Sequence, residues 1–191
     1  QARALGIPQL SYPEALSEVT RPYTTITVSG THGKSTTTAL LGKLFEAGGL
    51  DPSVVVGAEV PGWDHNLRIG KSKFFIAEAC EYRRHMMNLS PQAILLTNLE
   101  LDHPDYYQDL ADIKSAFHDY IEKLRGDGLL VINNDDANLR DITRTYDGAI
   151  VRYGLEGGVD LSVGNIKEIG AEMPMRTIGM LLGIPEEDQR A

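Results

Sequence analysis

Short apolar runs, separated by polar and glycine-containing stretches, recur along most of the chain. Two of them, 74–78 and 93–98, are almost continuously apolar before they end in polar side chains. Continuous runs of this kind are typical of parallel strands that are buried on both faces. We therefore expect strands over 24–28, 53–56, 74–78, 93–98, 128–132 and 149–153, and a further strand near the sheet edge over 161–169.

Apolar residues at helical spacing lie between these predicted strands. The clearest helical stripe, over 110–124, consists of Leu110, Ile113, Phe117, Ile121 and Leu124. The segment 39–47 has similar spacing and ends before a Gly-Gly pair, which is a common helix stop. A helix is also expected over 136–146, with Asp135 or Asp136 as its N-cap. Alternating strands and helices predict an α/β fold, with a mostly parallel sheet flanked by helices.

A glycine-containing loop follows the first predicted strand, with the sequence Ser-Gly-Thr-His-Gly-Lys-Ser-Thr over 29–36. Strand, glycine loop, lysine, hydroxyl and helix is the order of a phosphate-binding loop, whose backbone N–H groups face the phosphates. Lys34 would supply a charge to the outer phosphates, and Ser35 a hydroxyl ligand for Mg²⁺. The usual pattern has a glycine where Val28 stands, so an ordinary strand-to-helix turn is the alternative.

Polar residues also follow two other predicted strands. Glu78 ends one apolar run, and His103 follows the next one. Because ligands of parallel sheets bind at the carboxyl ends of the strands, we expect both side chains near the loop. Glu78 would share Mg²⁺ with Ser35, the alternative being a capping or ion-paired carboxylate. Imidazole is a less usual ligand for Mg²⁺, so the spacing alone favours a structural role for His103 equally well.

Three residues close to Glu78 carry weaker predictions. No base for Cys80 is identifiable from the sequence, so we do not expect this thiol to act as a nucleophile. Arg83 and Arg84 are interpreted as part of a solvated face, although either could bind an anionic substrate.

Composition excludes some classes of partner. The net charge is −9 and the pI is about 5.0, whereas a nucleic-acid surface needs clustered Lys and Arg. No stretch approaches the roughly 20 apolar residues of a membrane span. A single cysteine, Cys80, is typical of a reducing compartment. We therefore expect a cytoplasmic protein with no nucleic-acid or membrane partner.

Three segments together resemble, in order, the signatures of the Mur ligases, the ATP-dependent amide-bond ligases of peptidoglycan precursor synthesis. They are Gly-Thr-His-Gly-Lys-Ser-Thr over 30–36, Glu-Ala-Cys-Glu-Tyr-Arg-Arg-His over 78–85, and Thr-Asn-Leu-Glu-Leu-Asp-His over 97–103. The resemblance implies a P-loop NTPase-like central domain that binds ATP and Mg²⁺. It assigns phosphate binding to Gly30, Thr31, His32, Gly33, Lys34, Ser35 and Thr36. It assigns catalysis to Lys34, Glu78 and His103, and metal binding to Ser35, Glu78 and His103.

The resemblance also implies the substrates. The histidine of the loop and the 78–85 segment look most like the family member that joins L-alanine to the carboxylate of UDP-N-acetylmuramate through an acyl phosphate. A relative that attaches a recycled tripeptide to the same sugar is the alternative. A nucleotide-binding module without ligase chemistry, and a folate or polyglutamate ligase of the same fold, are further rivals.

A domain organisation follows from the same resemblance. Residues 1–23 are expected to be an entry segment from a missing N-terminal domain, and 24–191 the ATP-binding central domain of a protein that also has a C-terminal domain. Residues 176–184 resemble the end of the family's helix on the adenine side. The Gly-x-His-Asn-x-x-Asn segment that opens this helix in the family is not found before them. We therefore expect residues to be missing near 175–178.

Overall fold

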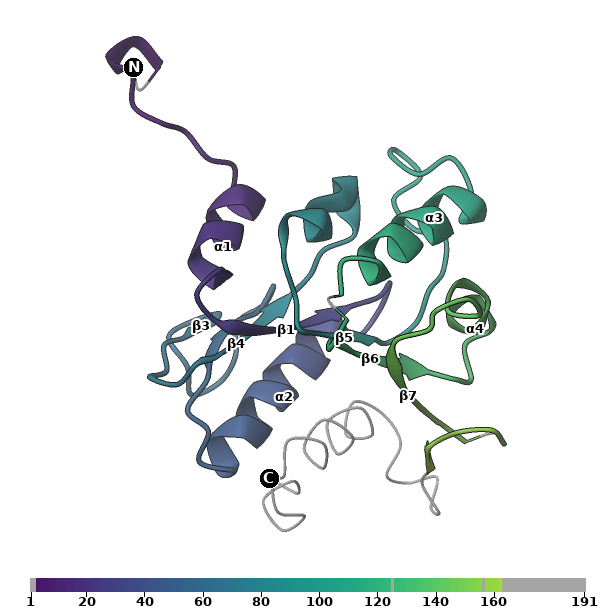
Figure 1. Cartoon of the computed structure of the whole chain (residues 1–191). Helices are drawn as coiled ribbons and strands as arrows, with labels where there is room; N and C mark the ends of the chain where they lie inside the picture. The colour runs from purple at the N-terminus through teal and green to yellow at the C-terminus, as the bar shows by residue number, and fades with distance from the viewer. Residues whose placement is uncertain (1–2, 125, 156, 163–191) are drawn as a thin grey trace.

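The computed structural model describes residues 3–124, 126–155 and 157–162. In these residues one eight-stranded sheet has the order β3-β2-β4-β1-β5-β6-β7-β8 (Figure 1). All neighbouring strands are parallel except β2 and β3. The strands are β1 (Thr24–Ser29), β2 (Ser53–Val55), β3 (Leu67–Arg68), β4 (Phe74–Glu78), β5 (Ala93–Leu96), β6 (Leu129–Asn133), β7 (Ala149–Gly154) and β8 (Leu161–Ser162).

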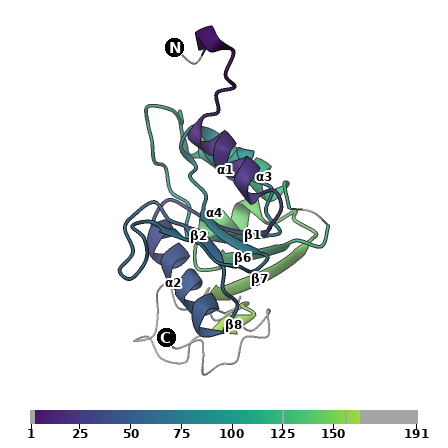
Figure 2. The same cartoon turned by 90° about the vertical axis from the view of Figure 1, so that its left-hand side faces the viewer.

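Helices cover both faces of this sheet. The described part of the chain contains η1 (Arg3–Leu5), α1 (Tyr12–Thr20), α2 (Lys34–Ala47), η2 (Tyr82–Asn88), α3 (Leu110–Ile121) and α4 (Ala137–Ile142). Figures 1 and 2 show α2 against one face, and α1 and α3 on the opposite side. The predicted α/β fold, with a mostly parallel sheet flanked by helices, is therefore confirmed.

The central strands are buried on both faces, which explains their continuous apolar runs. In β5, Ile94 and Leu96 pack into the cluster beneath α3, whereas Leu95 between them packs into the cluster beneath α2. All three side chains are fully buried. Since side chains alternate across a strand, a strand with helices on both sides has no position that favours a polar residue.

Several element bounds differ from those expected. The stripe over 110–124 gives a helix that ends at Ile121, and the helix expected over 136–146 ends at Ile142, with Asp136 as its N-cap. The stretch between the strands expected over 53–56 and 74–78 contains a further short strand, the antiparallel β3. Of the strand expected over 161–169, the described residues include β8; the rest, like the predicted gap near 175–178, lies outside the described residues.

Residues 3–10 stand apart from the sheet (Figures 1 and 2). Residues 3–10 are exposed, whereas α1 packs on η2, and the Ser17 hydroxyl donates a hydrogen bond of 2.7 Å to the Asn88 carbonyl. Whether 1–23 enters from a preceding domain stays a prediction. Among the described residues, no helix combines the length and apolarity needed to cross a membrane.

The topology brings three strand ends together. In the sheet, β1 lies between β4 and β5, and Val28 is in register with Glu78 on one side and with Leu95 on the other. The residues that follow these strands therefore meet at one edge of the sheet, as expected for a parallel arrangement.

Candidate functional site: a phosphate loop beside an acidic cluster

The glycine loop joins β1 to α2, and Gly33 and Gly30 are both needed there, for different reasons. Gly33 is the N-cap of α2 at a φ of 80°, and no side chain caps this helix. The first backbone N–H groups of a helix have no intrahelical partner, and no side chain of the described residues caps them here. Gly30 has a φ of 135°, and a Cβ there would lie 2.2 Å from Thr97 Oγ1. The loop is thus open at Gly33 and tightly packed at Gly30.

The residues that follow β5 hold this loop in place. Asn98 Oδ1 accepts a 2.8 Å hydrogen bond from the His32 N–H, and Asn98 Nδ2 donates to the His32 carbonyl. The Thr97 hydroxyl donates to the same carbonyl at 2.7 Å. Thr31 Oγ1 exchanges hydrogen bonds with the Glu100 backbone. The backbone of His32 and the side chain of Thr31, both predicted to bind phosphate, therefore serve to anchor the loop.

Lys34 lies across the inner side of the loop. Its Nζ donates to the carbonyls of Gly30 at 2.6 Å and Thr31 at 3.0 Å, and it forms an ion pair of 3.0 Å with Glu81 Oε1. The Lys34 side chain is 14% exposed and that of Glu81 only 1%. Because buried charges need partners, this pair neutralises a carboxylate that would otherwise be costly to bury.

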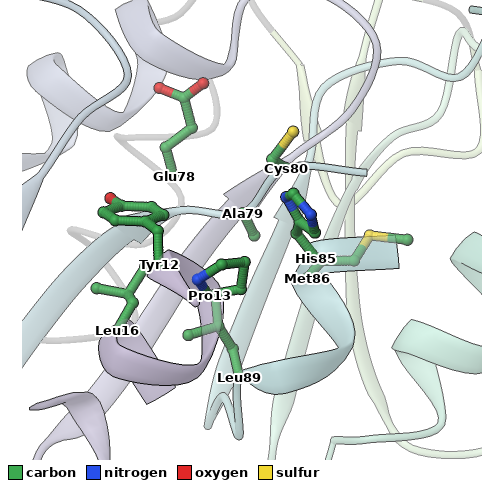
Figure 3. A pocket seen from close by; sticks show the side chains of 9 residues that line it. All are labelled: Tyr12, Pro13, Leu16, Glu78, Ala79, Cys80, His85, Met86 and Leu89. Atoms are coloured by element: carbon green, nitrogen blue, oxygen red, sulfur yellow. The ribbon is translucent and has the colours of Figure 1, made fainter. Parts of the chain in front are cut away.

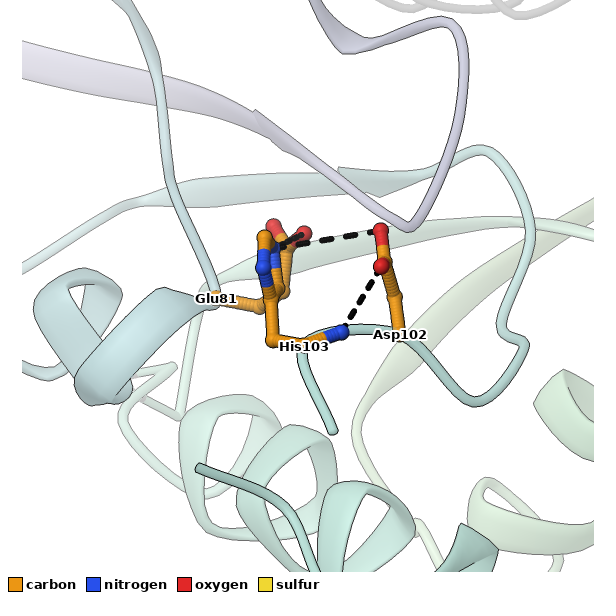
Figure 4. Close-up of side chains that lie close together, drawn as sticks. All are labelled: Glu81, Asp102 and His103. Carbon is orange, nitrogen blue, oxygen red and sulfur yellow. Dashed lines mark hydrogen bonds and ion pairs between the residues drawn. The ribbon is translucent and has the colours of Figure 1, made fainter. Parts of the chain in front are cut away.

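Glu81 also belongs to a cluster with Asp102 and His103 (Figure 4). One ligand atom from each of the three residues lies within 4.8 Å of the other two, and His103 Nε2 is 3.2 Å from Glu81 Oε1. Glu81 Oε2 is buried and has no hydrogen-bond partner among the described residues. An acceptor left unpaired in this way has a desolvation cost that a cation would relieve. Two carboxylates and an imidazole can hold a divalent ion, so the residues fit the metal that the family resemblance implies.

A shell of aromatic side chains fixes the position of this cluster. Tyr107 is buried, and its hydroxyl donates a 2.6 Å hydrogen bond to the Glu81 carbonyl. Desolvation by burial raises the pKa of Tyr107, so its hydroxyl keeps its proton and remains a donor. The Tyr82 ring lies 4.8 Å from the His103 ring, and the Tyr82 hydroxyl donates to Asp105 Oδ2 at 2.7 Å.

Backbone strain is concentrated next to the cluster. Arg83, Arg84 and His103 have φ values of 50°, 57° and 54°. These values lie in the left-handed region, where residues other than glycine are strained. Each such residue costs roughly 1–2 kcal/mol, and such residues gather at functional sites. The left-handed pair Arg83–Arg84 breaks the regular geometry of η2 directly after Glu81. The turn after β4 thus keeps a strained conformation beside the buried carboxylate.

Glu78 is not one of the three residues of this cluster, and its predicted metal binding with Ser35 and His103 stays a prediction. Its Oε2 accepts a 2.6 Å hydrogen bond from the Gly57 N–H. Its side chain lines a small pocket with Tyr12, Cys80 and His85 (Figure 3). Among the described residues, the carboxylate that joins Lys34 to His103 is Glu81. Glu78 was predicted because it ends the strand, and the turn that follows brings a second carboxylate, Glu81, to Lys34 of the loop.

Two residues of the cluster were therefore missed in the sequence. Glu81 lies inside the 78–85 segment, and a second carboxylate three residues after the first was the available signal. Asp102 directly precedes His103, and its Oδ1 accepts from the His103 N–H at 2.7 Å. Its acidic side chain next to a candidate ligand was a comparable signal.

The residues given weaker predictions are also placed. Burial raises the pKa of the Cys80 thiol, which disfavours the thiolate. Arg84 forms ion pairs with Asp119 at 2.7 Å and Asp112 at 3.8 Å, so it belongs to a structural link to α3. The Arg83 guanidinium instead lies over the Tyr82 ring, 5.3 Å from its centre.

Together, a mostly parallel α/β sheet, an open glycine loop at a helix start and an inward lysine define a nucleotide-binding domain of the phosphate-loop class. The model of the Mur ligase middle domain matches residues 28–180, and the chain therefore belongs to the Mur ligase family.

Individual relatives agree with this membership. The chain is 44% identical over 170 residues to the UDP-N-acetylmuramate–L-alanine ligase of Borreliella burgdorferi, covering 87% of this chain and 36% of that protein. The chain thus spans little more than a third of that relative's length.

Two solved structures are also similar. One is the UDP-N-acetylmuramate:L-alanyl-gamma-D-glutamyl-meso-diaminopimelate ligase of Neisseria meningitides, with a TM-score of 0.72 and 29% identity over 80% of this chain and 52% of that one. The other is the UDP-N-acetylmuramate-alanine ligase of Thermotoga maritima, with a TM-score of 0.78 over 98% of this chain and 49% of that one. At 19% identity, the second likeness shows the fold alone.

Proposed function

We propose that the protein containing this chain is a cytoplasmic, ATP-dependent ligase that joins L-alanine to the carboxylate of UDP-N-acetylmuramate. The carrying observation is the contact chain from Lys34 through Glu81 to His103 at an open phosphate loop. The 44% identity to a ligase named for these two substrates supports the choice of acceptor. In the proposed reaction the carboxylate attacks the γ-phosphoryl group of ATP, and the amine of L-alanine then displaces phosphate from the acyl phosphate.

The loop residues would hold the phosphates. Lys34 would exchange a loop carbonyl for phosphate oxygens, and the uncapped N–H groups at the start of α2 would donate to the same phosphates. Gly30, Thr31, His32 and Gly33 shape the loop, and Ser35 and Thr36 lie on the first turn of α2. Phosphoryl transfer depends on charge neutralisation and alignment more than on covalent help from the protein, so these roles match the demand.

Mg²⁺ would supply the remaining charge neutralisation at two sets of oxygen and nitrogen donors. Ser35 and Glu78 are the proposed ligands of one ion, as the family resemblance implies. Glu81, Asp102 and His103 are the proposed ligands of the other, on the ground that Glu81 Oε2 is buried and unpaired within the described structure. Since the Glu81 carboxylate contacts both Lys34 and His103, it would couple phosphate binding to metal binding.

The acceptor sites would be completed by domains outside this chain. The chain covers 36% of the Borreliella relative, which is consistent with further domains before and after it. We therefore expect the isolated chain to bind nucleotide weakly and to catalyse no ligation.

Phosphate release by the full-length protein tests the proposal. With ATP, Mg²⁺ and UDP-N-acetylmuramate, we expect release to depend on added L-alanine. Release only with the tripeptide L-alanyl-γ-D-glutamyl-meso-diaminopimelate would instead assign the ligation for which the Neisseria structure is named. Nucleotide binding with no acceptor-dependent release would favour a nucleotide-binding module and would contradict the ligase proposal.

A further inference from the structure

We propose that Arg83 recognises a substrate carboxylate, and that it therefore sets specificity for an acid substrate in the ligation; this inference rests on the proposed function. The carboxylate is either that of the sugar acceptor or the α-carboxylate of the incoming amino acid. Arg83 would bind it through the two-pronged hydrogen bonding that a guanidinium offers.

The two arginines of the turn are separated by their contacts. Arg84 is committed to α3, because its guanidinium donates to Asp119 and lies 3.8 Å from Asp112. Arg83 is exposed, and within the described residues it forms no ion pair with a carboxylate. The consecutive left-handed residues thus direct one cation into the fold and leave the other for a partner outside it.

The position of Arg83 relative to the cluster supports a role in binding. The Tyr82 ring contacts both the Arg83 guanidinium and the His103 ring. Tyr82 is itself held by its hydrogen bond to Asp105 and by the Tyr106 ring. A fixed ring under the Arg83 guanidinium limits the positions that this group can take. The entropy cost of ordering the Arg83 side chain on binding is therefore reduced.

The chemistry of the reaction places a carboxylate in this region. The acceptor carboxylate must reach the γ-phosphoryl group, beside Lys34 and the cluster. The amine of the amino acid attacks the carboxyl carbon of the acceptor, and the α-carboxylate of the amino acid is only two bonds from that amine nitrogen. Either carboxylate must therefore come close to the acidic residues Glu81 and Asp102, whose charge repels it. The Arg83 guanidinium, which lies over the Tyr82 ring that contacts His103, would offset that repulsion.

Steady-state kinetics of the full-length protein test this proposal, with ATP, UDP-N-acetylmuramate and L-alanine varied separately. For Arg83→Gln we expect the KM of one acid substrate to rise about tenfold or more, the loss expected for one charge-assisted hydrogen bond. The KM of ATP and the thermal midpoint should stay unchanged. Arg83→Lys should restore part of the loss, because it keeps the charge but not the planar fork. Arg144→Gln, at an exposed pair with Asp141, is the matched control.

The two sources of the carboxylate give different results. A raised KM for L-alanine, with weaker discrimination against L-alaninamide, assigns the α-carboxylate. A raised KM for UDP-N-acetylmuramate assigns the acceptor, and direct binding of that substrate by calorimetry should weaken in parallel.

Three outcomes overturn the inference. They are unchanged KM values for both acids, an equal rise for ATP, and a fall in thermal midpoint that Arg83→Lys does not repair. A wild-type protein inactive with L-alanine would overturn the proposed function, and this inference with it. An active wild type with an unaffected Arg83→Gln variant would overturn this inference alone.

Discussion

The phosphate loop and the turn after β4 solve the same geometric problem with different residues. In the loop, left-handed backbone occurs at Gly30 and Gly33, where glycine removes the steric cost. In the turn, Arg83 and Arg84 occupy that region despite their side chains. The loop conformation is therefore favoured by local residue type, whereas the turn depends on contacts made elsewhere, such as those of Arg84 with α3.

This difference matches what each region offers to a ligand. The loop offers backbone donors and the start of a helix, which require small residues and close approach. The turn offers charged side chains, with Glu81 inward and Arg83 outward. Charged side chains can be positioned by a strained backbone only if tertiary contacts hold it.

The largest effect should come from Lys34, which connects the two regions. We expect Lys34→Ala in the full-length protein to abolish phosphate release, because the phosphates lose their charge partner and Glu81 loses its ion pair. Lys43→Ala, further along the same helix at an ion pair with Glu46, is the control and should keep its activity. Activity within about tenfold of wild type, a barrier change near 1.4 kcal/mol, would contradict the assignment.

A second substitution pair asks which strand-end carboxylate holds the metal more tightly. We expect Glu81→Gln to weaken Mn²⁺ binding to the ADP complex by about tenfold or more, and more than Glu78→Gln does. The reason is that Glu81 has an unpaired buried oxygen within the described structure, whereas Glu78 accepts a bond from Gly57. Calorimetric titration with Mn²⁺ measures both. A larger loss for Glu78→Gln would assign the tighter metal site to Glu78 instead.

Two glycine substitutions separate the cost of backbone strain in the loop from the cost of tight packing. Gly30→Ala and Gly33→Ala both place a Cβ on left-handed backbone, at roughly 1–2 kcal/mol. At Gly30 the new Cβ would also lie 2.9 Å from the Asn98 carbonyl, and such overpacking adds about 1–3 kcal/mol. At Gly33 it meets nothing within 4 Å. Thermal unfolding of the full-length variants should therefore show the larger loss of stability for Gly30→Ala. Equal losses of stability would show that the residues around Asn98 shift to accommodate the new Cβ.

These contrasts explain how far the sequence could be interpreted. The position of the loop, including Gly33 and Lys34, was predicted because spacing and residue type encode a strand, a tight turn and a helix start. The buried strands were predicted because two-sided burial gives continuous apolar runs. The packing of Gly30 on Thr97 could not be predicted, since it joins residues far apart in the sequence.

The acidic cluster was predicted only in part, for a physical reason. A carboxylate at a strand end has a known direction, so Glu78 was the natural choice. The path of the next three residues depends on tertiary contacts, such as the hydrogen bond from the Tyr107 hydroxyl to the Glu81 carbonyl. Residue type alone therefore did not distinguish Glu81 from Glu78.

The smallest expected effect concerns Asp136, which links α4 to the segment that anchors the loop and carries His103. Asp136 caps α4 through its Oδ1, and its Oδ2 also accepts a 2.9 Å bond from the Leu99 N–H. Leu99 lies in the segment that anchors the loop and carries His103. We expect Asp136→Ala to cost about 1 kcal/mol for the cap and about 1 kcal/mol for the second bond.

Asp109→Ala is the matched control, because Asp109 caps α3 by a bond to the Asp112 N–H from an exposed position. Amide hydrogen exchange in the full-length protein separates the two contributions. Asp136→Ala should speed exchange in both α4 and 97–103, whereas Asp109→Ala should act on α3 alone. Faster exchange confined to α4 in Asp136→Ala would mean that the loop and the cluster are held without this bond, and that their coupling runs through Lys34 and Glu81 instead.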